Sequence, residues 1–203
     1  MDKTQHWENV YRTKSSSEVS WFETDPKQSL DLILRAAGSS RGRVIDVGGG
    51  QSFLVDRLLD EGFAGVSVLD ISSAAIEATK ARLADRASQV QWIVSDITKS
   101  IVLGTFDIWH DRAVFHFLTD PNDRKHYIDL LKRSLPVGGH FVVGTFATGG
   151  PEKCSGLDVR QYDAVTMQDE LGDSFVPVIA DEYEHRTPWG KPQMFYFGVF
   201  RRQ

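Results

Sequence analysis

Short apolar segments alternate with amphipathic segments along most of the chain, and this alternation most narrows the possible folds. Residues 43–48 (RVIDVG) predict a strand, and residues 51–62 predict a helix with its apolar side chains on one face. Further strands are predicted at 64–70, 90–96, 106–111 and 140–147, and further helices at 26–38, 72–87 and 123–135. Strands that alternate with helices of this length pair in parallel and form a sheet covered on both faces. The sequence therefore predicts a doubly wound α/β fold.

The last part of the chain changes to long β-rich runs. A short helix is predicted at 166–172, and strands are predicted at 174–186 and 191–202. The intervening TPWG is a turn signal. The two runs therefore predict an antiparallel hairpin on the edge of a sheet that is otherwise parallel.

Composition and charge exclude several classes of protein. The chain has 203 residues, 41% hydrophobic and 25% charged, as one ordinary globular domain has. A net charge of −5 argues against nucleic acid as a partner, because phosphate binding needs a basic face. No apolar run reaches the roughly 18 residues of a membrane span, and the start has no apolar signal-peptide core. Cys154 is the only cysteine, which fits a reducing compartment, so we expect a cytoplasmic protein. The sequence leaves the oligomeric state open.

The glycines of VIDVGGGQS mark the expected ligand site. Ligands of doubly wound sheets lie beyond the carboxyl ends of the strands, where glycines allow close approach of the backbone. Asp70 ends the second predicted strand, where a carboxylate can accept hydrogen bonds from ribose hydroxyls. Asp96 ends the third beside Ile97, where it can meet the amine of adenine. Helix capping would explain either aspartate alone, but with the glycines in register they predict an adenosine site.

The local chemistry distinguishes between dinucleotides and S-adenosylmethionine. A dinucleotide fingerprint is G-x-G-x-x-G, and Phe53 replaces its third glycine here. Asp46 precedes the glycines, where a carboxylate would repel a pyrophosphate. The same carboxylate suits the ammonium and sulfonium of S-adenosylmethionine, which we predict as the cofactor.

These motifs resemble class I S-adenosylmethionine-dependent methyltransferases over nearly the whole chain. VIDVGGGQS is similar to the first motif, with Ser52 where a further glycine is common. VSVLDIS, VSDI and FDIWHDRAVFHFL resemble the second, third and fourth motifs, and the terminal hairpin is a hallmark of the family. The resemblance implies a Rossmann-like three-layer sandwich whose seven strands have the order 3-2-1-4-5-7-6. It also implies a single domain over 1–203, with a lid at 1–24 and a core at 25–203.

The resemblance completes the predicted cofactor site and implies S-adenosylhomocysteine as the product. The expected contacts are Trp21, Asp46, Gly48, Gly49, Gly50, Ser52, Asp70, Ile71, Asp96, Ile97 and Asp111.

A finer resemblance concerns WHDRAVFHFLTDPNDRKHYIDLL at 109–131, which is similar to the fourth-motif region of thiopurine and thiol methyltransferases. The N-terminal HWENVYRTKSSSEVSWFETDP resembles the aromatic lid of the thiol-type enzymes. Some protein-lysine methyltransferases have an Asp-Lys-Gly segment at the end of strand four, and Arg112-Ala113 departs from that pattern.

The predicted acceptor pocket is aromatic. Methyl transfer is an in-line displacement, so the site must position the acceptor and exclude water. Trp7 and Tyr11 share a face if residues 5–13 are helical, and aromatic rings can favour a sulfonium by cation–π attraction. The alternative is that these rings only pack the N-terminal segment onto the sheet. The predicted substrate contacts are Trp7, Tyr11, Phe22 and Arg112.

Three residues near the end of strand four are catalytic candidates. Arg112 can bind an anionic group of the acceptor, or brace Asp111 or Asp46. His110 and His116 are candidate bases by residue type, although a histidine near a strand end more often has a structural role. Cys154 is interpreted as an incidental thiol, and no histidine spacing indicates a metal.

The sequence therefore predicts a methyltransferase that acts on a small-molecule acceptor through sulfur, a heavier chalcogen, oxygen or nitrogen. Two alternatives stay open at this point: a protein-lysine methyltransferase, and a cofactor-binding protein without turnover.

Overall fold

The computed structural model describes residues 2–203, and its main sheet has seven strands in the order β3-β2-β1-β4-β5-β9-β8. The parallel strands are β1 (Arg43–Val47), β2 (Gly65–Asp70), β3 (Val90–Val94), β4 (Ile108–Arg112) and β5 (His140–Phe146). The hairpin strands are β8 (Phe175–Arg186) and β9 (Pro192–Arg202), with β9 antiparallel to β5. Numbered one to seven along the chain, these strands confirm the predicted doubly wound fold and its order.

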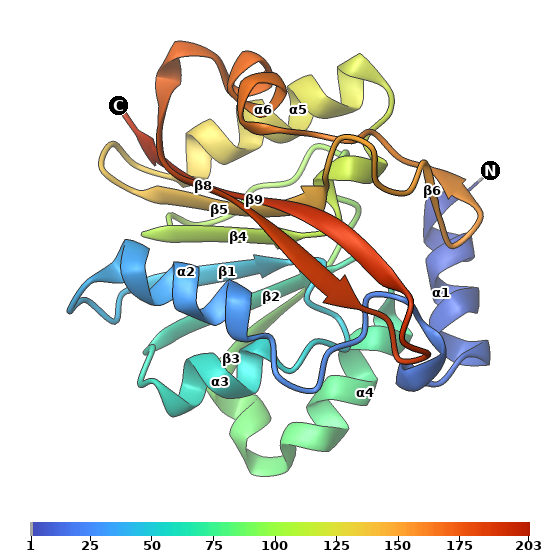
Figure 1. Cartoon of the computed structure of the whole chain (residues 1–203). Coiled ribbons are helices and arrows are strands. Elements are labelled where there is room, and N and C mark those ends of the chain that lie inside the picture. The colour runs from blue at the N-terminus through green and yellow to red at the C-terminus, as the bar shows by residue number, and fades with distance from the viewer. Residues whose placement is uncertain (1) are drawn as a thin grey trace.

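Helices cover both faces of this sheet (Figure 1). The α-helices are α1 (Lys3–Thr13), α2 (Lys27–Ala37), α3 (Leu54–Asp60), α4 (Ser73–Leu83), α5 (Pro121–Ser134) and α6 (Ala164–Leu171). One core cluster joins the sheet to Leu131 of α5 and Met167 of α6, and the other joins it to Leu58 of α3 and Ile76 of α4. The result is the expected three-layer sandwich. None of the helices described is both long and apolar enough to cross a membrane.

Local sequence sets where the helices begin. Asp2 caps α1, Ser72 caps α4 by accepting from the Ala75 N–H, and Asp120 caps α5 ahead of Pro121. The short 3-10 helices are η1 (Ser16–Glu18), η2 (Ala84–Gln89), η3 (Phe115–Phe117) and η4 (Gly172–Ser174).

The N-terminal segment lies at the carboxyl ends of the parallel strands. In Figure 1, α1 stands at the end of the sheet to which the arrowhead of β1 points. A two-stranded sheet of β6 (Lys153–Cys154) and β7 (Leu157–Asp158) follows β5, and this small element was not predicted. Residues 2–24, the described part of the segment predicted as a lid, thus lie at the edge where ligands of doubly wound sheets bind.

Candidate active site at the carboxyl ends of the strands

Two adjoining cavities open at this edge and account for most of the predicted site. Both are lined by Tyr11, Trp21, Gly48 and Arg112. Of the other predicted residues, Trp7, Asp70, Ile71, Asp96 and Ile97 line the first cavity, and Phe22, Asp46, Gly49, Ser52 and His110 line the second. The two cavities thus meet at the glycine turn and share an aromatic wall.

The turn after β1 requires its glycines. Gly48 has a φ of 73°, and a side chain there would collide with Val114. A Cβ on Gly50 would lie 2.5 Å from Oδ2 of Asp70 and 2.7 Å from Cβ of Ala75. Gly50 lines neither cavity, contrary to its prediction as a contact; its role is to let the backbone pass close to Asp70.

Asp70 is positioned by the backbone at the end of β2. Its Oδ2 accepts a hydrogen bond from the Gly50 N–H at 3.0 Å, and its Oδ1 accepts one from the Ser72 N–H at 2.8 Å. Burial raises the pKa of Asp70 to about 6, against the lowering effect of these hydrogen bonds. A carboxylate has about four lone-pair sites, so Asp70 can accept further bonds from a ribose diol.

The part of the first cavity predicted to hold adenine contains the apolar Ile71 and Ile97 and the carboxylate of Asp96. Asp96 lies two residues past the end of β3 at Val94, not at the strand end as predicted. Its Oδ1 accepts from both the N–H and the Oγ1–H of Thr98, at 2.9 and 2.7 Å, and this holds the loop in a tight turn. Ile71 and Ile97 flank it in the same cavity.

Asp46 places a buried carboxyl group in the second cavity. His110 Nδ1 lies 2.7 Å from Asp46 Oδ1, and His110 Nε2 lies 2.9 Å from the Ser29 hydroxyl. Asp46 Oδ2 is buried without a hydrogen-bond partner among the residues described. This orphaned oxygen fits the cationic methionyl end of S-adenosylmethionine. His110 has both ring nitrogens engaged, so its geometry is that of a residue that orients Asp46 and not of a free base.

Two other predicted residues line neither cavity. Asp111 is fully buried and accepts hydrogen bonds from two backbone N–H groups and from the Tyr127 hydroxyl, the last at 2.6 Å. His116 is also fully buried, its Nδ1 accepts from the Phe146 N–H at 3.3 Å, and burial lowers its pKa to about 3. These hydrogen bonds hold both side chains in the core, and their predicted contacts with cofactor and acceptor stay predictions.

Arg112 binds the lid and braces neither Asp111 nor Asp46. Its guanidinium donates to the Trp21 carbonyl at 2.8 Å and pairs with Glu23 Oε1 at 2.9 Å. Glu23 also lies 3.0 Å from Nδ1 of His185 on β8. Burial tends to raise the pKa of Glu23, but His185 and Arg112 hold that pKa below its usual value. Sequence reasoning missed Glu23 and His185, because only the fold brings β8 to the lid.

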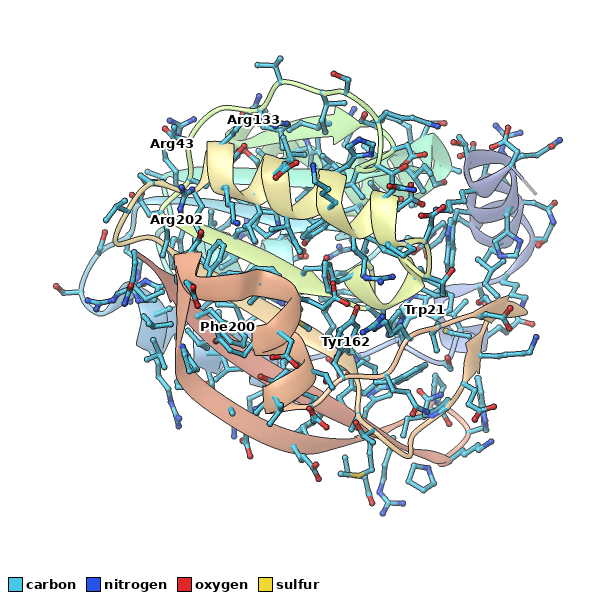
Figure 2. All side chains as sticks on the ribbon, turned by 90° about the horizontal axis from the view of Figure 1, so that it is seen from above. Trp21, Arg43, Arg133, Tyr162, Phe200 and Arg202 are labelled. Atoms are coloured by element: carbon cyan, nitrogen blue, oxygen red, sulfur yellow. The ribbon has the colours of Figure 1, made fainter. Side chains whose placement is uncertain are left out.

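Aromatic rings enclose the lid side of the first cavity. The Trp7 ring centroid lies 5.6 Å from that of Trp21 and 5.1 Å from that of Phe117. In Figure 2, Trp21 lies toward the α1 end of the molecule, while Arg43, Arg133 and Arg202 lie toward the opposite end. The rings both pack together and line the cavity, so packing is not their only role in this structure, and the role as a lid stays a prediction.

Phe22 and Cys154 are placed differently from these rings. Phe22 packs on Phe53, with centroids 6.1 Å apart, and lines the second cavity on the glycine-turn side. Cys154 lines the first cavity, and burial raises the pKa of its thiol, which makes it unreactive.

Comparisons with known proteins give the class of enzyme. A family model described as "Methyltransferase domain" matches residues 44–139. The eEF1A lysine and N-terminal methyltransferase of Danio rerio is 25% identical over 179 residues, 83% of this chain and 26% of that protein. The EEF1A lysine methyltransferase 2 of Danio rerio is 25% identical over 154 residues, 68% of this chain and 66% of that protein. The chain thus spans about a quarter of the first relative's length.

Solved structures share the fold. The N-methyltransferase NodS from Bradyrhizobium japonicum WM9, in complex with S-adenosyl-L-homocysteine, has a TM-score of 0.75, 18% identity and 99% coverage of both chains. A structure that concerns the conversion of a disulfide bond into a thioacetal group during echinomycin biosynthesis has a TM-score of 0.77 and 20% identity. It covers 98% of this chain and 93% of that one.

A methyltransferase domain model thus matches residues 44–139, and the chain shares the fold of solved methyltransferases such as NodS. NodS binds S-adenosyl-L-homocysteine, and the orphaned carboxylate oxygen of Asp46 and the free lone pairs of Asp70 fit S-adenosylmethionine here. The relatives and structures compared do not confirm the finer resemblance to thiopurine-type enzymes.

Proposed function

We propose that the enzyme methylates a small-molecule acceptor held beneath the aromatic lid. The observation that carries this proposal is that Trp7, Tyr11 and Trp21 line the first cavity while the lid is tied down over it. A cavity enclosed by the chain's own rings suits a small acceptor. A folded protein could reach the same place only after the lid opened.

The cofactor is proposed to occupy both cavities. The ribose would bind Asp70, with adenine beside Asp96 and Ile97 in the first cavity. The methionyl end would lie in the second cavity beside Asp46. The sulfonium would then lie where the cavities meet, between Gly48 and the shared aromatic wall.

The lid residues then have a defined task in the reaction. With S-adenosylmethionine bound, its sulfonium would supply an activated methyl group, and the lid residues would hold the acceptor atom opposite the sulfur while they exclude water. Positioning of this kind can supply roughly 7–11 kcal/mol of the barrier reduction. Burial raises the pKa of Tyr11 well above its usual value, so its phenol stays protonated and acts as a wall or a hydrogen-bond donor, not as a base.

The lining of the first cavity favours an acceptor that needs no strong base. Among the described lining residues its carboxylates are Asp70 and Asp96, and both are proposed to serve the adenosine. His110 is engaged by Asp46 and Ser29. A thiol ionises at a lower pH than a lysine ammonium, so a thiol-type acceptor fits this cavity better.

A second candidate is a protein amine as the acceptor. The observation that favours it is the 25% identity to proteins named as eEF1A lysine methyltransferases, over 83% and 68% of this chain. Under this candidate the lid opens for a polypeptide side chain.

An acceptor screen with methyl-labelled S-adenosylmethionine separates the two. Thiols, small acids, amines and whole-lysate proteins are offered to the wild type, to Trp21→Ala, and to Trp189→Ala as a control. Trp189 is 58% exposed on the hairpin turn and lines neither cavity. We expect label on a small molecule, a rate reduced at least about tenfold in Trp21→Ala, and no loss in the control. Label on a protein band alone would replace the proposal with the second candidate.

A further inference from the structure

Glu8 of the lid helix α1 reaches across to the first turn of α4. Its Oε2 accepts hydrogen bonds from the Ser72 hydroxyl at 2.7 Å and from the Ala74 N–H at 3.2 Å. Its Oε1 accepts from the Ser73 hydroxyl at 3.1 Å. Free N–H groups and the helix dipole make this end of α4 favourable for a carboxylate. The lid is therefore fastened to the core by a contact between segments far apart in the sequence.

The same serine also contacts the cofactor pocket. The Ser72 N–H donates to Asp70 Oδ1 at 2.8 Å, and the Ser72 hydroxyl accepts from the Ala75 N–H at 3.2 Å. Ser72 is fully buried, so it has little freedom to move independently of either partner. A continuous chain of hydrogen bonds thus runs from Glu8 through Ser72 to Asp70.

We propose that Glu8 is a positioning residue that couples closure of the lid to binding of the cofactor at Asp70. This inference rests on the proposed placement of the ribose at Asp70. When the lid is closed, Glu8 fixes Ser72, and Ser72 holds the Asp70 carboxylate in the orientation that accepts the ribose hydroxyls. Because coupling between two sites is reciprocal, a bound cofactor also stabilises the closed lid.

The exposure of the polar contacts of α1 explains how the bond between Glu8 and α4 can form and break. Lys3 pairs with Asp123 of α5 at 2.6 Å, but the Lys3 side chain is 41% exposed, and such pairs contribute little. Glu8 is 21% exposed, and the hydrogen bond from Ser72 is the largest effect that holds its pKa below the usual value. The lid is thus held at α4 by polar groups that water can replace when it opens.

Two variants and one matched control test the coupling. Glu8→Ala removes the three bonds accepted from α4 and also the pair with Arg12 within α1, whereas Glu8→Gln keeps an accepting oxygen. Glu18→Ala removes a carboxylate of the same segment that bonds only the neighbouring Ser15 among the contacts described. Calorimetry measures binding of S-adenosylhomocysteine. Hydrogen exchange of residues 3–23, with and without that ligand, measures closure of the lid.

We expect Glu8→Ala to weaken binding of S-adenosylhomocysteine at least about fivefold, the lower end of typical coupling. The ligand should slow exchange of the lid in the wild type and much less in Glu8→Ala, while Glu8→Gln lies between. The control should bind within about twofold of the wild type, as surface variants do. Melting of the ligand-free variants checks that each one folds.

The outcomes separate this inference from the proposed site. If Asp70→Ala binds S-adenosylhomocysteine as tightly as the wild type does, the ribose is not held at Asp70, and the placement on which the inference rests is wrong. If Asp70→Ala does weaken binding, but Glu8→Ala leaves both the affinity and the ligand-induced protection of residues 3–23 unchanged, then only the coupling is overturned.

Discussion

Asp70 illustrates at the scale of a single residue how burial sets the pH dependence of cofactor binding. Its pKa is raised to about 6, and ribose hydroxyls donate more strongly to its ionised form than to the protonated acid, which has fewer accepting lone pairs. As pH falls through about 6, the free enzyme protonates Asp70, and affinity for S-adenosylhomocysteine should fall by up to about tenfold per pH unit. Asp70→Asn should bind at least about tenfold more weakly at pH 8 and lose this dependence.

The measurement is calorimetry from pH 5 to 8, with melting of the ligand-free protein over the same range. Asp111 also has a pKa raised to about 6, but it lines neither cavity, so its titration should affect stability and not binding. A wild type whose affinity is flat across this range, or a pH dependence that persists in Asp70→Asn, would contradict the role given to Asp70.

Ala113 has the backbone conformation of a glycine. Its φ is 67°, and its N–H donates to the Gly144 carbonyl at 2.8 Å, which fixes the turn after β4. A left-handed conformation costs a residue with a Cβ roughly 1–2 kcal/mol. We therefore expect Ala113→Gly to raise the free energy of unfolding by about 1 kcal/mol in urea titrations. As a control, Ala78→Gly on the exposed face of α4 should lower the free energy of unfolding by about 1 kcal/mol. If Ala113→Gly also lowers the free energy of unfolding, the backbone at Ala113 is not strained.

Sequence reasoning located residues whose positions follow from the backbone. Asp46 and Asp70 were predicted because they flank a glycine turn and end a strand, and both line a cavity. The burial of Asp111 and His116 could not be predicted, because the partners that bury a side chain depend on packing across the sheet. Glu8 was missed for the same reason, since its partners lie on α4.

At the scale of elements, the N-terminal lid is joined to the core at both of its ends. Glu8 binds α4, and the Trp21 carbonyl binds Arg112 on β4. Removing residues 1–24 should leave a folded domain, because these contacts lie outside the two core clusters apart from the packing of Trp21. Methyl transfer to an identified acceptor should fall at least about a hundredfold, as misplacement of reactants does.

Circular dichroism and a transfer assay measure these two effects, with Trp21→Ala as the milder variant. Normal turnover by the truncated protein would place the acceptor pocket on the core alone. Loss of folding would mean that Val10 and Val19, which are both buried, belong to the core.

Element boundaries were predicted well where periodicity is strong. The predicted helix at 123–135 corresponds to α5, and the predicted hairpin strands lie within a residue of β8 and β9. The predicted strand at 90–96 was too long, because the loop that follows turns at Asp96. The two-residue strands β6 and β7 are too short to give a periodic pattern.

At the scale of the whole molecule, binding and stability are separated between the two ends of the sheet. The cavities of the proposed site lie at the carboxyl ends, under α1. At the other end, Arg202 of β9 donates to the carbonyl of Leu135 at 2.9 Å, and Arg43 lies over the Phe106 ring. Figure 2 shows both arginines on the side away from Trp21. Variants at that end should therefore change stability without changing cofactor selectivity.

Cofactor selectivity should appear in the stability of the whole domain. A ligand that binds only the folded state at about a hundred times its Kd adds about 2.7 kcal/mol to the free energy of unfolding. For a domain of this size that shift corresponds to a rise in Tm of roughly 5–10 °C. We expect this rise with S-adenosylhomocysteine and none with NAD at the same concentration, because the Asp46 carboxylate in the second cavity would repel a pyrophosphate. Scanning calorimetry measures the Tm with each ligand. A higher Tm with NAD but not with S-adenosylhomocysteine would overturn the assignment of both cavities.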